Sequence, residues 1–289
     1  MRGVVLIAVG DDSYLKWAFN MAASLKHYCN LPIQLISAKD PGNPFFDYVT
    51  IVDKAAYTGA NGELFPAKLK TSFYDLIEFD EAIYLDVDGV ILKDITPLFD
   101  IKGDFITEIQ GVYDTSQGSE FYHMKWAKPA VVYEHFGLPH DAKLPAINSS
   151  FMVIRKSDLC KELFTRAHDL VMNHALPYEK QWFTWGKPRG HKINQPDELY
   201  FNVALAQMNT VPVHARPIYF RMVSDSGENL TLDVIRANYY GIGLYGDSRT
   251  NHITTKEAYN REVVAVCREM NVPHHGKAEI LGLTKFVTS

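Results

Sequence analysis

Two aspartates stand directly after an apolar run in the segment IYLDVDGV, residues 83–90. Asp86 and Asp88 are separated by a single valine, and the residues before them are typical of a buried strand. Carboxylates at the end of a strand can hold a hard divalent cation through their oxygens. One of them could instead act as a covalent nucleophile. The surroundings of the pair must decide between these two chemistries, because a motif of this length is weak by itself.

A third ligand for a cation could come from one of the 11 histidines of the chain. We favour His252, which follows the glycine-containing segment GLYGDSRT at residues 243–250 and so stands near backbone that can approach a phosphate closely. His214 and His191 are competitors, and an ordinary polar residue before a helix is the plain alternative for His252. Two carboxylates with one imidazole favour Mn²⁺, and Mg²⁺ is the second choice.

Asp197 and Glu198 form a second acidic pair, at the start of the helical pattern that follows NQP. The positive end of a helix dipole stabilises anions at that place. The pair could therefore bind hydroxyl groups of a substrate, and simple helix capping is the alternative.

The elements that must position these residues begin with a strand–helix–strand unit. Residues 4–9 are a continuous apolar run and predict a buried parallel strand, and LPIQLIS at residues 31–37 predicts the next strand. Asp12 or Ser13 can cap the helix between them. Such a unit predicts an α/β fold with a mostly parallel central sheet flanked by helices.

The same patterns recur along the rest of the chain. Further strands are expected at residues 49–52, 82–85, 105–109 and 147–154. Further helices are expected at residues 68–79, 130–136, 157–174, 197–207 and 255–270. No repeat or linker interrupts them, so we expect one domain over residues 1–270 and a C-terminal arm over residues 271–289.

Composition limits the class of protein. The chain has 289 residues, 47% of them hydrophobic, and a formal net charge of -5, which gives no general attraction to nucleic acids or anionic membranes. We expect no membrane span and no signal peptide, because the first apolar run is short. The three cysteines are odd in number and far apart, so we expect a reducing cytoplasm.

The surroundings of the aspartates resemble those in the retaining family 8 glycosyltransferases of the GT-A fold, the glycogenin-like enzymes. Residues 68–99 show a lysine, an aromatic helix, an apolar strand, D-x-D and an apolar stretch that ends in LF, in the family's order. INSSFMVIRKSD at residues 147–158 resembles the family's N-S-G strand, and PDELYFNVAL at residues 196–205 resembles its D-Q helix start. AVGDDSY at residues 8–14 resembles the nucleotide-binding loop. The resemblance covers about residues 3–205 by order and spacing.

This resemblance implies a metal-dependent transfer of a sugar from a nucleotide-sugar donor, for which we expect UDP-glucose or UDP-galactose. Lys70, 16 residues before Asp86, matches the substrate-binding lysine of the family, and Lys68 is the alternate. The implied catalytic residues are Asp197, Glu198 and Lys70, and the implied metal ligands are Asp86, Asp88 and His252. The implied donor-binding residues are Ala8, Gly10, Asp11, Asp12, Tyr14, Lys70, Asp86, Val87, Asn148, Ser149 and Lys256. Retention through attack on the front face, with the leaving phosphate as base, needs no carboxylate nucleophile.

The sequence departs from the family pattern at several positions. Gly89 stands where threonine is common, Ser150 replaces the glycine of N-S-G, and Glu198 replaces the glutamine of D-Q. The C-terminal H-x-G-x-x-K-P-W motif is absent, and NHITTK at residues 251–256 is the nearest substitute. These departures concern the third metal ligand and the lysine at the diphosphate.

The acceptor is open. The segment YEKQWFTWGKPRGHK at residues 178–192 is aromatic and basic, which suits stacking against sugars or exposed bases, although a packed loop is the plain alternative. A glycan, a protein or a modified nucleic-acid base could each be the acceptor.

Two other classes compete with a transferase. DVDGV also resembles the motif of haloacid-dehalogenase-like phosphatases, in which Asp86 would be the nucleophile. That class normally opens with its nucleophile strand, whereas 85 residues precede Asp86 here. A protein that binds a nucleotide sugar without turning it over is the third possibility.

Overall fold

The computed structural model describes residues 1–60, 62–113, 127–177, 180, 196–216, 218–220, 232–243 and 253–270. The chain divides into two compact units. Unit 1 comprises residues 1–51, 84–101 and 216–289, and unit 2 comprises residues 52–83 and 102–215. The arm expected at residues 271–289 lies outside the described residues, so the proposed domain limits stay a prediction.

The predicted α/β fold with a mostly parallel central sheet is confirmed. In the described part of the chain, seven strands form a sheet in the order β3-β2-β1-β4-β7-β6-β8, and three more form a sheet in the order β5-β10-β9. The strands are β1 Arg2–Ala8, β2 Ile33–Ser37, β3 Tyr48–Ile51, β4 Glu81–Leu85, β5 Gly89–Ile91, β6 Phe105–Tyr113, β7 Leu144–Arg155, β8 Val213–His214, β9 Tyr219–Phe220 and β10 Gly241–Gly243. The helices are α1 Asp12–Tyr28, α2 Pro66–Ser72, α3 Pro129–Phe136, α4 Asp158–Asn173, α5 Asp197–Gln207, α6 Leu232–Asn238 and α7 Ile253–Glu269, and the 3-10 turns are η1 Lys54–Ala56, η2 Phe73–Leu76 and η3 Thr96–Asp100.

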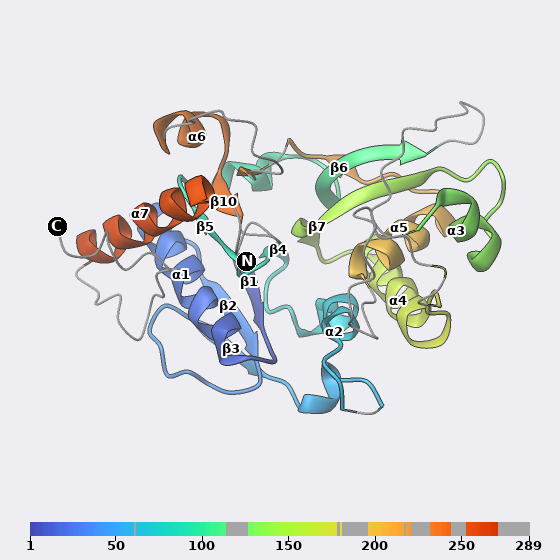
Figure 1. The fold of residues 1–289 in the computed structure, drawn as a ribbon, viewed down its shortest axis with the longest axis horizontal. Helices are drawn as coiled ribbons and strands as arrows, with labels where there is room; N and C mark the ends of the chain where they lie inside the picture. Colours follow the sequence, from blue (N-terminus) through green and yellow to red (C-terminus); the bar gives the residue numbers. More distant parts are fainter. Residues whose placement is uncertain are drawn as a thin grey trace. The chain divides into compact units, whose positions relative to one another are not determined.

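The strand–helix–strand opening of unit 1 is confirmed. β1 pairs with β2, and β2 with β3, each in parallel. Helix α1 packs against β1, β2 and α7, as Figure 1 shows. The capping prediction is wrong by one residue: Asp11 is the N-cap, because its backbone is extended and its carboxylate accepts a bond from the Ser13 N–H at 2.7 Å.

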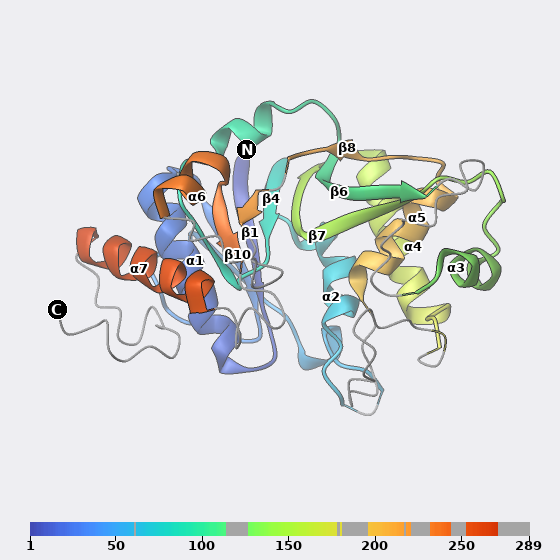
Figure 2. The same cartoon turned by 45° about the horizontal axis from the view of Figure 1, so that its top comes forward.

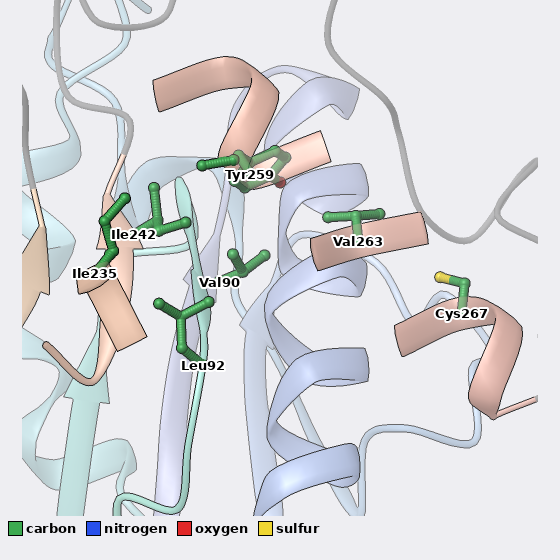
Figure 3. Packing of buried hydrophobic residues seen from close by; sticks show 8 residues of the cluster. Val90, Leu92, Ile235, Ile242, Tyr259, Val263 and Cys267 are labelled. Atoms are coloured by element: carbon green, nitrogen blue, oxygen red, sulfur yellow. The ribbon is translucent and has the colours of Figure 1, made fainter. Parts of the chain in front are cut away.

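A hydrophobic cluster of unit 1 ties the chain after the two aspartates to distant elements. β5 pairs antiparallel with β10, which pairs in parallel with β9. Figure 3 shows side chains from β5, α6, β10 and α7 packed together in this cluster. Its members are Val90, Leu92, Ile235, Ile242, Ala258, Tyr259, Val263 and Cys267. Because Val90 and Leu92 are fully buried, the residues just before them are held by a packed strand.

Unit 2 is built on an antiparallel pair. β6 runs antiparallel to β7 and parallel to β8. Helix α5 packs on β7 and on α4, and α4 also packs on α2; Figure 2 shows β6, β7 and these helices. The predicted helix at residues 68–79 is shorter than expected: α2 begins with Pro66 at its first turn and ends at Ser72, where η2 follows. None of the described helices is both long enough and apolar enough to cross a membrane.

Candidate functional site

The two aspartates belong to unit 1 and lie in a short connection between two buried strands. β4 ends at Leu85 and β5 begins at Gly89, so only Asp86, Val87 and Asp88 join them. The Tyr84 hydroxyl donates a hydrogen bond to Oδ1 of Asp86 at 2.6 Å. Asp88 is only 8% exposed. This burial argues against a solvated turn, which is the plain alternative for an acidic pair.

The chemistry of this pair fits a hard divalent cation. Burying an ionised carboxylate is costly unless it is hydrogen-bonded, paired or bound to a cation. Two carboxylates on one three-residue connection supply oxygen ligands of the kind that Mg²⁺ and Mn²⁺ take. The described residues contain no cluster of three or more His, Cys, Asp or Glu side chains arranged for a metal. His252 and His191 lie outside the described residues, so the third ligand stays a prediction.

The turn between β1 and α1 carries the first group of predicted donor-binding residues. Ala8 is the buried last residue of β1, and Gly10 has a φ of 98°, a left-handed conformation that favours glycine. The backbone N–H of Ser13 lowers the pKa of the exposed Asp11 below its usual value. These features form a compact turn at the start of α1, and the Asp11 carboxylate is already engaged as the helix cap.

Two further residues of that turn also have partners. The carboxylate of Asp12 accepts a hydrogen bond from Lys39 Nζ at 2.8 Å, and both side chains are largely exposed. The ring of Tyr14 packs edge-on against Trp17, with centroids 5.6 Å apart. Tyr14 is half-buried, so it packs on its own helix while keeping an accessible part.

In unit 2 the structure brings together three of the predicted residues. Lys70 Nζ of α2 lies 3.2 Å from Oδ2 of Asp197, the first residue of α5. The Ser149 hydroxyl of β7 donates to the same oxygen at 2.5 Å. The side chains of Lys70 and Asp197 are 12% and 21% exposed, so this ion pair is largely shielded from water. Glu198 follows in the first turn of α5 and is half-buried.

Asn148 belongs to a neighbouring network that includes a residue we did not predict. Its side-chain amide donates to Oε2 of Glu108 at 2.7 Å, and its Oδ1 accepts from the Ser150 hydroxyl at 2.8 Å. Glu108 of β6 is buried, at 8% exposed. A single glutamate inside a strand pattern gave no signal in the sequence, and only the pairing of β6 with β7 reveals its role.

A bulge in β7 aims these side chains. The expectation that Asn148 and Ser149 start a strand is wrong, because β7 begins at Leu144 and the two lie within it. Glu108 pairs with Asn148, whereas Thr107 pairs with Met152, so residues 149–151 have no partner on β6. The buried Thr107 hydroxyl lies 2.9 Å from the Asn148 carbonyl oxygen and 2.8 Å from the Phe151 carbonyl oxygen. Bulges of this kind are common beside functional sites because they redirect side chains.

Two further predicted residues are His214 and Lys256. His214 is exposed on β8, and its Nδ1 accepts from the Ile109 N–H at 3.1 Å, which commits one of its ring nitrogens. Lys256 falls in α7, but its side chain lies outside the described part of the structure. The aromatic and basic segment at residues 178–192 also lies outside it, except for Lys180.

Comparison with solved structures identifies the fold. The chain is similar to the galactosyltransferase LgtC in complex with donor and acceptor sugar analogues, with a TM-score of 0.57 and 14% identity over 96% of this chain and 100% of that one. It is similar to the glycosyltransferase GlyE of Streptococcus pneumoniae TIGR4, with a TM-score of 0.54 and 14% identity over 93% of this chain and 63% of that one. It is also similar to the bifunctional glycosyltransferase WbbM, with a TM-score of 0.53 and 10% identity over 93% of this chain and 50% of that one. No family model and no curated protein matches the sequence. The likeness confirms the predicted GT-A fold.

Proposed function

We propose that the protein is a metal-dependent glycosyltransferase that moves a sugar from a nucleotide-sugar donor to an acceptor. The observation that carries the proposal is the Asp86–Val87–Asp88 connection after β4, in which Asp88 is buried, in a chain whose fold is that of glycosyltransferases along 96% of its length. Fold alone does not assign a reaction, so the assignment depends on the side chains at the site.

Asp86 and Asp88 are the proposed ligands of Mn²⁺ or Mg²⁺, with His252 as the proposed third ligand. When bound, the cation would neutralise the negative charge of the leaving diphosphate. Asp86 could instead receive a ribose hydroxyl, while Asp88 alone holds the cation. The turn after β1 is the proposed place of the nucleoside, with Ala8, Gly10, Asp12 and Tyr14 beside the cap residue Asp11.

The Lys70–Asp197 pair is the proposed sugar-binding group. A carboxylate accepts hydrogen bonds from sugar hydroxyls, and the ammonium group of Lys70 lies 3.2 Å from it. Asn148 is proposed to donate to the same sugar through its amide. Glu198, in the next position of α5, would contact the donor sugar or the acceptor.

Retention of the anomeric configuration is the favoured outcome. In that mechanism the acceptor hydroxyl attacks the sugar on the face that the diphosphate leaves, and a leaving phosphate oxygen takes its proton. Asp197, Glu198 and Lys70 would orient the sugar, and none of them needs to form a covalent bond to it.

The donor is proposed to be UDP-glucose or UDP-galactose. The similar LgtC structure is a galactosyltransferase, which supports a hexose donor for a chain of this fold. The acceptor stays open among a glycan, a protein and a modified nucleic-acid base. We also keep the cytoplasm as the proposed compartment, because the three cysteines are free and buried rather than paired.

A thermal-shift screen tests the donor assignment. Ligands that bind only the native state raise its stability, by about 2.7 kcal/mol when the concentration is one hundred times Kd. We expect UDP-glucose or UDP-galactose to raise Tm by several degrees with Mn²⁺ and by much less after EDTA. GDP-mannose and CMP-sialic acid serve as controls. Equal shifts for all nucleotide sugars, or none for any, would contradict the proposal.

A further inference from the structure

We propose that Ser149 is a positioning residue for Asp197 and does not itself bind the sugar. The inference rests on the proposed function, and it changes the role that the sequence predicts for Ser149. The inference depends on two observations: the Ser149 hydroxyl already donates its proton, and Oδ2 of Asp197 accepts it.

The Ser149 hydroxyl is already committed. A serine carries a single hydroxyl proton, and here that proton is donated to Oδ2 of Asp197 across 2.5 Å. A hydrogen bond from a hydroxyl to a carboxylate at this distance is charge-assisted and among the stronger kinds. Ser149 is also only 2% exposed. It has neither a spare proton nor an accessible surface to offer a sugar hydroxyl.

Both partners of Asp197 use the same carboxylate oxygen. Lys70 Nζ approaches Oδ2 at 3.2 Å, and the Ser149 hydroxyl bonds to Oδ2 as well. Among the described residues, Oδ1 accepts no hydrogen bond. Because both contacts fall on Oδ2, the described residues leave Oδ1 its capacity to accept from a ligand hydroxyl.

The backbone supports this arrangement specifically. Ser149 is the first of the three bulged residues of β7, and the Thr107 hydroxyl lies 2.9 Å from the carbonyl oxygen of Asn148, just before the bulge, and 2.8 Å from that of Phe151, its last residue. A regular pairing would leave Ser149 in register with β6. The bulge instead aims its hydroxyl at the first turn of α5, on which β7 packs.

A double-mutant cycle on donor binding tests the inference. The probes are the UDP-sugar that the thermal-shift screen selects and UDP alone, each titrated with Mn²⁺ by calorimetry. Ser149→Ala should raise the Kd of the UDP-sugar about tenfold and leave the Kd of UDP unchanged, because only the sugar would contact Asp197. Ser149→Ala added to Asp197→Ala should cost nothing further, since Ser149 acts through that carboxylate.

Two control variants separate positioning from a general packing effect. Ser149→Thr keeps the hydroxyl and should restore most of the sugar affinity. Ser150→Ala removes a neighbouring buried hydroxyl that bonds to Asn148 rather than to Asp197. Its effect should therefore add to that of Asp197→Ala in full.

Three outcomes would overturn the inference. A further loss of sugar affinity when Ser149→Ala is added to Asp197→Ala would mean that Ser149 touches the sugar. An equal loss of UDP and UDP-sugar affinity in Ser149→Ala would mean a merely structural role. Failure of the wild-type protein to bind any UDP-sugar would remove the proposed function and this inference together, and the wild-type titration identifies that case separately.

Discussion

The connection after β4 and the bulge of β7 both hold polar side chains for the proposed reaction, but they are assembled over very different chain distances. Asp86 and Asp88 are two positions apart, on three residues between two buried strands. The cluster around Asp197 instead draws Lys70 from α2 and Ser149 from β7, so its members are separated by up to 127 positions along the chain.

This difference determines how each group can fail. The aspartates depend on the strands that end on either side of them, so their geometry survives as long as β4 and β5 pack. The Asp197 cluster depends on two helices, a strand and a bulge. A change at one of its contacts should therefore disturb the others. Substitutions at the first group should therefore remove chemistry with little effect on stability, whereas substitutions at the second should weaken sugar binding and stability together.

The largest effect is expected for Asp88→Asn. The substitution keeps the size of the side chain and removes its charge, so the fold should remain while Mn²⁺-dependent UDP-sugar turnover falls by at least ~10²–10³, the usual cost of losing one electrostatic group in an active site. Steady-state turnover at saturating Mn²⁺ measures this, and Tm checks the fold. Wild-type turnover in the variant would remove the metal assignment from the connection after β4.

The next largest effect is expected at His252, the proposed third metal ligand. His252→Ala should weaken Mn²⁺-dependent UDP binding by about 10–100-fold, the range seen when support of a metal site is lost. His214→Ala is the matched control, because His214 bonds to the Ile109 N–H. Calorimetric titration of UDP with Mn²⁺ compares the two variants. A normal titration for His252→Ala with a weak one for His214→Ala would exchange their roles.

A smaller effect on activity is expected for Lys70→Met. The variant removes the cation beside the shielded Asp197 carboxylate and leaves the bond from Ser149 in place, so the KM for the UDP-sugar should rise about tenfold, and the free energy of unfolding should fall by about 1–3 kcal/mol. Lys68→Met is the control on the same helix, since Lys68 Nζ bonds to the Ala55 carbonyl at 2.6 Å. Equal KM values for both variants would break the assignment of Lys70 to the sugar.

The smallest effect on activity is expected at the bulge itself. Thr107→Val removes the hydroxyl that holds the Asn148 and Phe151 carbonyls, and we expect a loss of about 1–3 kcal/mol in the free energy of unfolding with only a few-fold rise in KM. Thr107→Ser keeps the hydroxyl and should retain most of the stability. Urea denaturation of the two variants decides whether the bulge is held in this way.

Much of the fold follows from local patterns that the sequence displays. The bounds predicted for the helix at residues 197–207 coincide with α5, and β1, β2 and β7 lie within a few residues of their predicted places. These segments are long or strongly apolar, so their periodicity is clear. β5, β8, β9, β10 and α6 were not predicted, because strands of two or three residues and a helix of seven residues carry too little pattern.

The functional groups were predictable to different degrees for the same reason. The acidic pair is visible because both aspartates follow one apolar run. The meeting of Lys70, Ser149 and Asp197 is not, since no local pattern encodes a contact between α2, β7 and α5. The helix start pointed to Asp197, whereas the resemblance alone suggested Lys70 and Ser149. Glu108 and Thr107 were missed altogether, because their roles come from the register between β6 and β7.

Analysis of the products tests the central claim most directly. Incubation of the protein with the selected UDP-sugar and Mn²⁺, followed by chromatography and intact-protein mass spectrometry, should yield UDP without inorganic phosphate and without an adduct on Asp86, because in a transferase this carboxylate only binds. An aspartyl-phosphate on Asp86, or release of phosphate from a simple phosphomonoester at enzymatic rates, would instead assign the acidic pair to a phosphatase and contradict the account.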